Sequence, residues 1–188
     1  MAHPLNWSCT CGRVQGTWSG ASSSRILCYC ESCRVFAEEL GAGDIIDPAG
    51  GSDLLQMPPD AFGITKGREH LAWTKRTEKG PVRWFTTCCN TPMANTLGSP
   101  KIPFLTLQTA YFEPPEASGP IVARVNRKGA TGHIEGEMGS ARRVIWAFAR
   151  RAIRARLTGS YKKNPFFDAQ GTPIAKRATP APRTPPAP

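Results

Sequence analysis

Short apolar stretches separated by turn-forming residues occupy most of the chain from Leu5 to about Arg127. Each stretch is only a few residues long and is bounded by Gly, Pro, Ser or Asn, as in Lys79-Gly80-Pro81. The expected strands are 13–18, 25–29, 54–56, 62–65, 71–75, 82–85, 102–107 and 121–125. Many short strands with few helical periods predict a mainly β domain of antiparallel strands over residues 5–138, rather than repeated βαβ units.

Two helices interrupt this pattern. Residues 31–40 place Phe36 and Leu40 four apart, and Gly41 provides a stop. A second helix is expected within residues 139–163, where Ser140 can cap the start and Gly159 can end it. An apolar stripe follows three- and four-residue spacing along this second helix: Ile145, Phe148, Ala149, Ala152, Ile153 and Leu157. The spacing predicts an amphipathic helix.

The net charge of +10 lies entirely in the last 50 residues of the 188-residue chain. Residues 1–138 contain 13 Lys+Arg and 13 Asp+Glu, whereas residues 139–188 contain 11 basic residues and one acid, Asp168. An acid-free basic cluster is formed by Arg142, Arg143, Arg150, Arg151, Arg154, Arg156, Lys162 and Lys163. The sequence leaves three roles open for the basic helix expected within residues 139–163. It can pack on the β domain with its arginines solvated, lie on an anionic membrane surface with Trp146 and Phe148 inserted, or contact nucleic-acid phosphates without base specificity.

The C-terminal segment 169–188 is rich in Ala, Pro and Thr. Such a segment has little apolar surface to bury, so a disordered tail is expected. The start of the chain lacks the basic and apolar regions of a signal peptide, and no apolar run approaches the ~20 residues that a membrane span needs. A cytoplasmic location is therefore expected.

All seven cysteines fall into three groups: Cys9 and Cys11, then Cys28, Cys30 and Cys33, then Cys88 and Cys89. In a reducing compartment such cysteines favour metal binding or catalysis over disulfides. Thiolates two or three positions apart can reach one tetrahedral zinc ion, whereas adjacent cysteines on a strand point to opposite faces. The spacing predicts one or two Zn²⁺ ions per chain.

The cysteines lie in three segments: Ser8-Cys9-Thr10-Cys11-Gly12-Arg13-Val14, Cys28-Tyr29-Cys30-Glu31-Ser32-Cys33-Arg34 and Arg83-Trp84-Phe85-Thr86-Thr87-Cys88-Cys89-Asn90-Thr91-Pro92-Met93. These segments resemble the glutathione-dependent formaldehyde-activating enzyme/CENP-V domain family. The resemblance spans residues 7–112 and implies a complex β fold like that of methionine sulfoxide reductase B. It also implies a structural zinc site that includes Cys9, Cys11 and Cys89. Finally, it implies a catalytic site of Cys28, Cys30 and Cys33, whose open fourth position takes a substrate thiol such as glutathione.

The third segment departs from the family pattern Arg-x-Phe-Cys-x-x-Cys-Gly-Thr-Pro-Leu. Thr86 stands where the first cysteine belongs, and Asn90 replaces the glycine. Three completions of the structural site remain open: Cys88, if the strand ends there in a tight turn; one of the cysteines of the second group, which would leave a single closed site; or His70. His133, in a Gly-rich stretch, has a claim as weak as that of His70, and His3 lies in the N-terminal tail.

An open three-thiolate zinc site has a definite chemical use. Zinc lowers the pKa of a bound thiol, and the resulting thiolate can add to an aldehyde, or the reverse reaction can cleave the carbon–sulfur bond. Arg34, which follows the second group, is a candidate donor to the sulfurs. The predicted function is a carbon–sulfur lyase activity. The alternative is a non-catalytic zinc module whose basic helix, through residues 142–163, binds an anionic membrane or nucleic acid.

Overall fold

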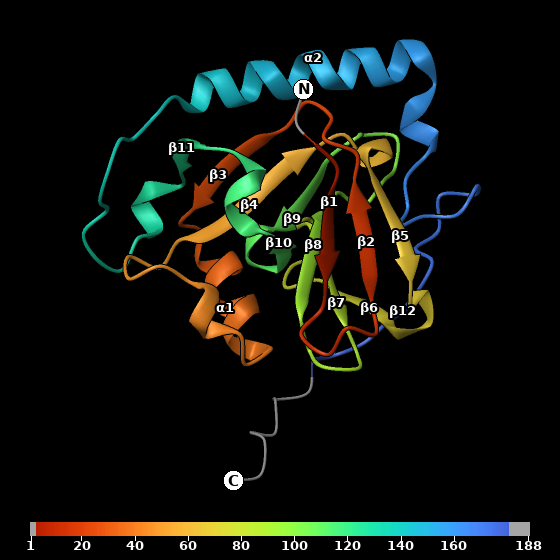
Figure 1. Cartoon of the computed structure of the whole chain (residues 1–188), viewed down its shortest axis with the longest axis horizontal. Helices are drawn as coiled ribbons and strands as arrows, with labels where there is room; N and C mark the ends of the chain where they lie inside the picture. The colour runs from red at the N-terminus through yellow and green to blue at the C-terminus, as the bar shows by residue number, and fades with distance from the viewer. Residues whose placement is uncertain (1–2, 181–188) are drawn as a thin grey trace, which may run out of the picture.

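Two β-sheets form the body of the protein, seen in a computed structural model that describes residues 3–180 (Figure 1). The smaller sheet has the order β10 (Phe112–Glu113), β1 (Leu5–Ser8), β2 (Gln15–Trp18) and β5 (Phe62–Lys66). The larger sheet has the order β11 (Ile121–Val125), β3 (Ser24–Cys28), β4 (Ser52–Met57), β9 (Leu105–Gln108), β8 (Pro92–Thr96), β7 (Val82–Thr86), β6 (Leu71–Thr74) and β12 (Lys176–Arg177). The prediction of a mainly β protein is confirmed.

The predicted strands all appear, with ends shifted by a few residues, but β1, β8, β10 and β12 were not expected. The expectation of antiparallel strands is wrong at both edges of the larger sheet, where β11 pairs with β3 and β12 pairs with β6 in parallel. Short 3₁₀ turns connect the elements: Gly43–Ile45, Pro59–Ala61, Arg68–His70, Thr109–Tyr111, Pro115–Ser118, Arg127–Gly129 and Ser160–Lys162.

The largest hydrophobic cluster contains residues of both sheets. Trp7 and Trp18 of the smaller sheet and Trp84 of the larger sheet are almost fully buried in it. Phe166 packs on Trp84 with ring centroids 4.8 Å apart. Burial of such large side chains is the dominant stabilising term for this packing.

The segment after the second helix belongs to this body. Phe166 and Phe167 are buried in the main core, and β12 extends the larger sheet. The backbone carbonyl of Ala175 accepts a hydrogen bond from Trp73 Nε1 at 3.0 Å. The tail expected to be disordered from residue 169 is therefore packed on the sheet as far as Ala178, and residues 181–188 lie outside the described part.

Two helices flank the sheets (Figure 1). Helix α1 (Glu31–Glu39) begins directly after Cys30, which occupies the N-cap position. Helix α2 (Ala141–Thr158) runs along the outside of the molecule. The hydroxyl of Ser140 accepts a hydrogen bond from the Arg143 N–H at its start, and Gly159 ends it in the left-handed region. Within the described residues, neither helix combines the length and apolar character that a membrane crossing requires.

The face of α2 that packs on the protein differs from the predicted apolar stripe. Val144 and Ala155 are buried, and Phe148 contacts Phe104 with ring centroids 5.8 Å apart. Arg151 also points inward and donates to Ser24 Oγ and to Gln56 Oε1 at 3.2 and 2.7 Å. Half of the predicted stripe faces outward instead, since the side chains of Ile145, Ile153 and Leu157 are exposed.

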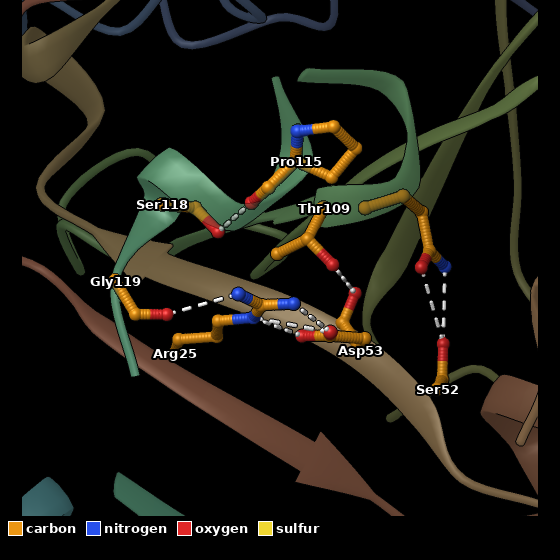
Figure 2. Close-up of polar contacts among 8 residues, drawn as sticks. Arg25, Ser52, Asp53, Thr109, Pro115, Ser118 and Gly119 are labelled. Atoms are coloured by element: carbon orange, nitrogen blue, oxygen red, sulfur yellow. Dashed lines mark hydrogen bonds and ion pairs between the residues drawn. The ribbon is translucent and has the colours of Figure 1, made fainter. Parts of the chain in front are cut away.

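A polar network fixes the segment that leads into β11 (Figure 2). Arg25 Nη2 lies 2.7 Å from Asp53 Oδ2, and Arg25 Nη1 donates to the Gly119 carbonyl at 2.9 Å. Thr109 Oγ1 donates to the Asp53 carbonyl. These contacts hold residues 114–119 against β3 and β4, so that β11 adds to the edge of β3 and brings Asn126 next to Cys28.

Candidate metal centres

The seven cysteines are free thiols that gather in two groups within the described residues. Cys9, Cys11, Cys88 and Cys89 form one group, called the four-cysteine cluster here. Cys28, Cys30 and Cys33 form the other, the three-cysteine cluster. Within each group the sulfurs all lie within 4.8 Å of one another, so each can hold a metal ion. A single site combining Cys9, Cys11 and Cys89 with a sulfur of the second group does not form.

The first half of the four-cysteine cluster is the turn between β1 and β2. Cys9 accepts a backbone hydrogen bond from Gly12 and donates one to Val14, while Gly12 has a positive φ of 72°. The Val14 N–H also points at Cys9 Sγ, at 3.3 Å. This tight turn places Cys9 and Cys11 with their sulfurs 3.6 Å apart.

The second half is the turn between β7 and β8. Strand β7 ends at Thr86, so Cys88 and Cys89 lie in the turn and are freed from the alternation of side chains along a strand. Asn90 takes a left-handed conformation with φ 52°, which Gly adopts freely and Asn tolerates. The hydroxyl of Thr86 accepts a hydrogen bond from the Thr91 N–H at 3.1 Å and closes the turn. Cys88, and neither Thr86 nor His70, completes this group.

The sulfur spacings of the four-cysteine cluster match a tetrahedral thiolate site. Four sulfurs at ~2.3 Å from a zinc ion stand ~3.8 Å apart along each edge of the tetrahedron. Cys9 Sγ lies 3.9 Å from Cys88 Sγ, Cys11 Sγ lies 3.4 Å from it, and the sulfurs of Cys88 and Cys89 are 3.7 Å apart. A disulfide, at ~2.05 Å, is much shorter than any of these distances.

The three-cysteine cluster lies where β3 meets α1. Cys28 ends β3, Cys30 caps α1 and Cys33 lies in its first turn, so all three sulfurs gather at the positive end of the helix dipole. Cys33 Sγ lies 3.8 Å from Cys28 Sγ, close to a tetrahedral edge, and 2.9 Å from Cys30 Sγ, which is shorter. Cys28 and Cys33 are buried, whereas Cys30 is half exposed.

A buried arginine faces this cluster. Arg83 of β7 is 2% exposed, and its two terminal nitrogens lie 3.9 and 3.8 Å from Cys33 Sγ. It donates to Ser32 Oγ at 2.8 Å and to Asn95 Oδ1 at 2.9 Å, and its guanidinium stacks over the Phe36 ring. None of the ion pairs among residues 3–180 includes Arg83.

A second donor comes from the opposite side. Asn126, in the left-handed region with φ 55°, donates from Nδ2 to Cys28 Sγ at 3.2 Å. Arg34, the donor expected from the sequence, instead contacts the Gly129 carbonyl at 3.1 Å and Glu38 at 3.9 Å. Arg83 and Asn126 were not predicted from the sequence, because no pattern of neighbouring residues indicates that either side chain reaches the three-cysteine cluster. The one available signal for Arg83 was its place in the third family-like segment.

Neighbouring groups shift the pKa values of the cysteine thiols, some downward and some upward. Hydrogen bonds from Cys28 and Cys33, together with the charge of Arg83, hold the pKa of Cys30 far below that of an ordinary thiol. Hydrogen bonding to Cys28 and Cys30 and burial raise the pKa of Cys33. Burial acts to raise the pKa of Cys89, but hydrogen bonds from Thr10, Thr86 and Thr91 outweigh it and lower that pKa to about 5.

No histidine side chain joins either cluster within the described residues. His70 Nε2 lies 3.6 Å from Glu69 Oε1, while His3 and His133 are exposed.

The fold and the clusters define a mainly β protein with two cysteine centres, each able to hold a metal ion. The chain belongs to DUF6151, a family of unknown function, whose model matches residues 1–176. No curated protein matches it. Among solved structures, it is similar to a Rhodobacter sphaeroides protein from a structural genomics programme, with 16% identity and a TM-score of 0.44. That match covers 62% of this chain and 96% of the other.

Proposed function

We propose that this protein is a zinc protein with carbon–sulfur lyase activity, in which the three-cysteine cluster binds a substrate thiol through an open metal position. Three thiolates with no nitrogen or carboxylate ligand favour a soft or borderline ion, and zinc is the common one. Within the described residues no fourth side chain joins the cluster, which supports an open position. The half-exposed Cys30 marks the side from which a small thiol would approach.

The burial of Arg83 carries this proposal. A guanidinium stays charged, and burying it without a counter-charge is costly. No carboxylate of the described residues pairs with it, and the nearest groups that can carry negative charge are the sulfurs of the three-cysteine cluster. Arg83 therefore supports a cluster of thiolates, which is the form that binds metal.

Each residue around the cluster has a separate task. Cys28, Cys30 and Cys33 would hold the ion, Asn126 donates to Cys28 and fixes that sulfur, and Arg83 would offset the negative charge at Cys33. Zinc, when bound, lowers the pKa of a thiol coordinated beside these sulfurs. In the net reaction the thiol sulfur bonds to an aldehyde carbon, and the thiol proton passes to the carbonyl oxygen. The reverse reaction releases both compounds.

The four-cysteine cluster has a structural role in this proposal. It joins the β1–β2 turn of the smaller sheet to the β7–β8 turn of the larger sheet, and four thiolates leave no position for a substrate. One closed structural site and one open substrate site, as proposed here, support a distant relation to the glutathione-dependent formaldehyde-activating enzyme/CENP-V family. A fold like that of methionine sulfoxide reductase B and glutathione as the thiol are parts of the same proposal.

The proposal is tested by metal analysis and by an exchange assay. The purified protein is expected to contain two zinc ions per chain, and Cys30→Ser is expected to lose one of them. NMR exchange between glutathione, formaldehyde and their adduct should be faster with the protein present and return to the uncatalysed rate with Cys30→Ser. Glu31→Gln, which changes an exposed residue next to Cys30, serves as a control that keeps both metal and rate.

Two results would end the lyase proposal. One is a single zinc per chain that Cys30→Ser leaves in place. The other is an exchange rate that is the same for the parent protein and Cys30→Ser while two zinc ions are bound.

A further inference from the structure

The outer face of α2 is an apolar strip without a partner in the described structure. Trp146, Ile153 and Leu157 are 68%, 59% and 84% exposed, and their spacing of seven and four residues places them on one side of the helix. This side is opposite to Val144 and Ala155, which pack on the protein. Isolated exposed apolar residues are ordinary, but a row of three large ones along a helix marks an interaction surface.

The apolar surface continues beyond the helix. A hollow of about 330 Å³ beside α2 is lined by the apolar side chains of Ile102, Pro103, Phe148, Ile153 and Leu157, together with the basic residues Lys101 and Arg156. Ile102 is itself 45% exposed. The hollow shares Ile153 and Leu157 with the strip and extends its apolar surface toward Ile102, with Arg156 and Lys101 at its border.

Arginines border the strip on both sides. Arg143, Arg150 and Arg154 follow the same seven- and four-residue spacing along one flank, and Arg142 and Arg156 follow the other. All five are exposed, and none takes part in an ion pair within residues 3–180. Helix α2 contains no acidic residue. The surface is therefore apolar along its centre and positively charged along both edges.

We infer that this face of α2 binds an anionic lipid surface, with the helix lying in the plane of the membrane. Trp and Leu along the centre enter the headgroup region, and the long arginine side chains reach back to lipid phosphates and carboxylates. Figure 1 shows α2 along the outside of the molecule, so that its 18 residues, ~27 Å in length, can meet a flat surface together.

Two other occupants fit the surface less well. A second copy of the chain, placed antiparallel on the same helix, would bring arginine rows together without acids to pair with them. Nucleic acid would accept the arginines but would leave Trp146, Ile153 and Leu157 against phosphates rather than in an apolar medium. The inference is independent of the proposed lyase activity.

Vesicle flotation with the full-length protein tests this inference. The protein is expected to float with phosphatidylcholine vesicles that contain one third phosphatidylserine, and to remain at the bottom of the gradient with phosphatidylcholine alone. Arg150→Gln with Arg154→Gln should weaken the affinity roughly 30-fold, since each basic residue near such a surface contributes about a factor of five. Lys66→Gln with Arg68→Gln, two exposed residues on and beside β5, removes the same charge and should leave binding unchanged.

Trp146 provides a direct readout, because the other tryptophans are buried or half buried. Its fluorescence should shift to shorter wavelength on addition of anionic vesicles, and Trp146→Phe should abolish the shift while retaining flotation. Trp146→Ala should weaken binding by at least about tenfold.

Three results would overturn the inference. The first is no flotation with anionic vesicles, and the second is equal loss of binding in the Lys66/Arg68 control. The third is a parent protein that does not bind vesicles but forms a dimer in sedimentation, or a complex with DNA, that Trp146→Ala disrupts.

Discussion

The guanidinium of Arg83 lies within 3.8 Å of the sulfur of Cys33, although the two residues are 50 positions apart. Strand β7 and helix α1 thus share a buried contact between a fixed cation and a thiol. The contact links the body of the larger sheet to the three-cysteine cluster, so we expect a change at Arg83 to act on stability and on the proposed metal binding together.

Arg83→Met tests this coupling. It removes the buried cation but keeps a long apolar side chain over Phe36, and the sulfurs lose the guanidinium that faces them. We expect the free energy of unfolding to fall by about 3–5 kcal/mol, as when one partner of a buried charge pair is removed. The metal of the three-cysteine cluster should also be lost. Denaturant unfolding and metal analysis measure the two effects.

Arg76→Gln is the matched control for Arg83→Met. Arg76 pairs with Glu39 at the other end of α1, but both side chains are partly exposed, so the expected loss is about 0–1 kcal/mol with metal content unchanged. Equal effects of the two substitutions would contradict a special role for Arg83.

The fourth ligand of the four-cysteine cluster is tested by a pair of substitutions in one turn. Cys88→Ser should remove one metal equivalent, because Cys88 Sγ is in contact with three other sulfurs. Thr86→Val should retain the metal but lower stability by about 1–3 kcal/mol, because the buried Thr91 N–H then has no acceptor. Loss of metal in Thr86→Val, with retention in Cys88→Ser, would reverse the assignment.

Substitutions at the adjacent residues Val144 and Ile145 test which face of α2 packs on the protein. Val144 is 6% exposed and Ile145 is 64% exposed. Val144→Ala should lower the free energy of unfolding by about 1–3 kcal/mol. Ile145→Ala should change it by less than about 0.5 kcal/mol. Thermal or urea unfolding distinguishes the two. A larger loss of stability for Ile145→Ala would mean that the apolar stripe expected from the sequence packs on the protein.

Cys89 gives the metal-free protein a pH dependence. Its pKa of about 5 in the folded chain is below the ~8.5 of a free thiol, so its thiolate stabilises the fold above that higher value. The contribution is lost as the pH falls through about 5. The stability advantage of the parent over Cys89→Ser should therefore grow between pH 5 and 8.5, as measured by urea unfolding with chelator and reductant. An advantage that is constant or shrinks over this range would contradict the assigned shift.

Strands with a strong local signal could be predicted from the sequence, and those fixed by tertiary contacts could not. The predicted range 121–125 coincides with β11, whose sequence is rich in Ile and Val. Strand β8 was missed because Pro92-Met93-Ala94-Asn95-Thr96 contains poor strand formers. Its burial between β7 and β9 decides its conformation.

The same limit applies to the candidate centres and to α2. Cysteine spacing indicated metal sites, but the partition into four and three depended on a turn at Cys88 that the sequence allowed without requiring. For α2, helical periodicity showed an apolar stripe without revealing which side faces the sheets. Arg151 took an inward position because Ser24 and Gln56 accept its hydrogen bonds, a contact across more than 90 residues.

The four-cysteine cluster also has a consequence for the order in which the chain matures. Cys11 and Cys88 are 77 residues apart, so a growing polypeptide that ends before the β7–β8 turn has only half of this ligand set. Two thiolates hold an ion weakly, and the remaining pair arrives only with the larger sheet. Metal capture at this position would thus be a late event, and an ion held there would mark a chain whose two sheets have already come together.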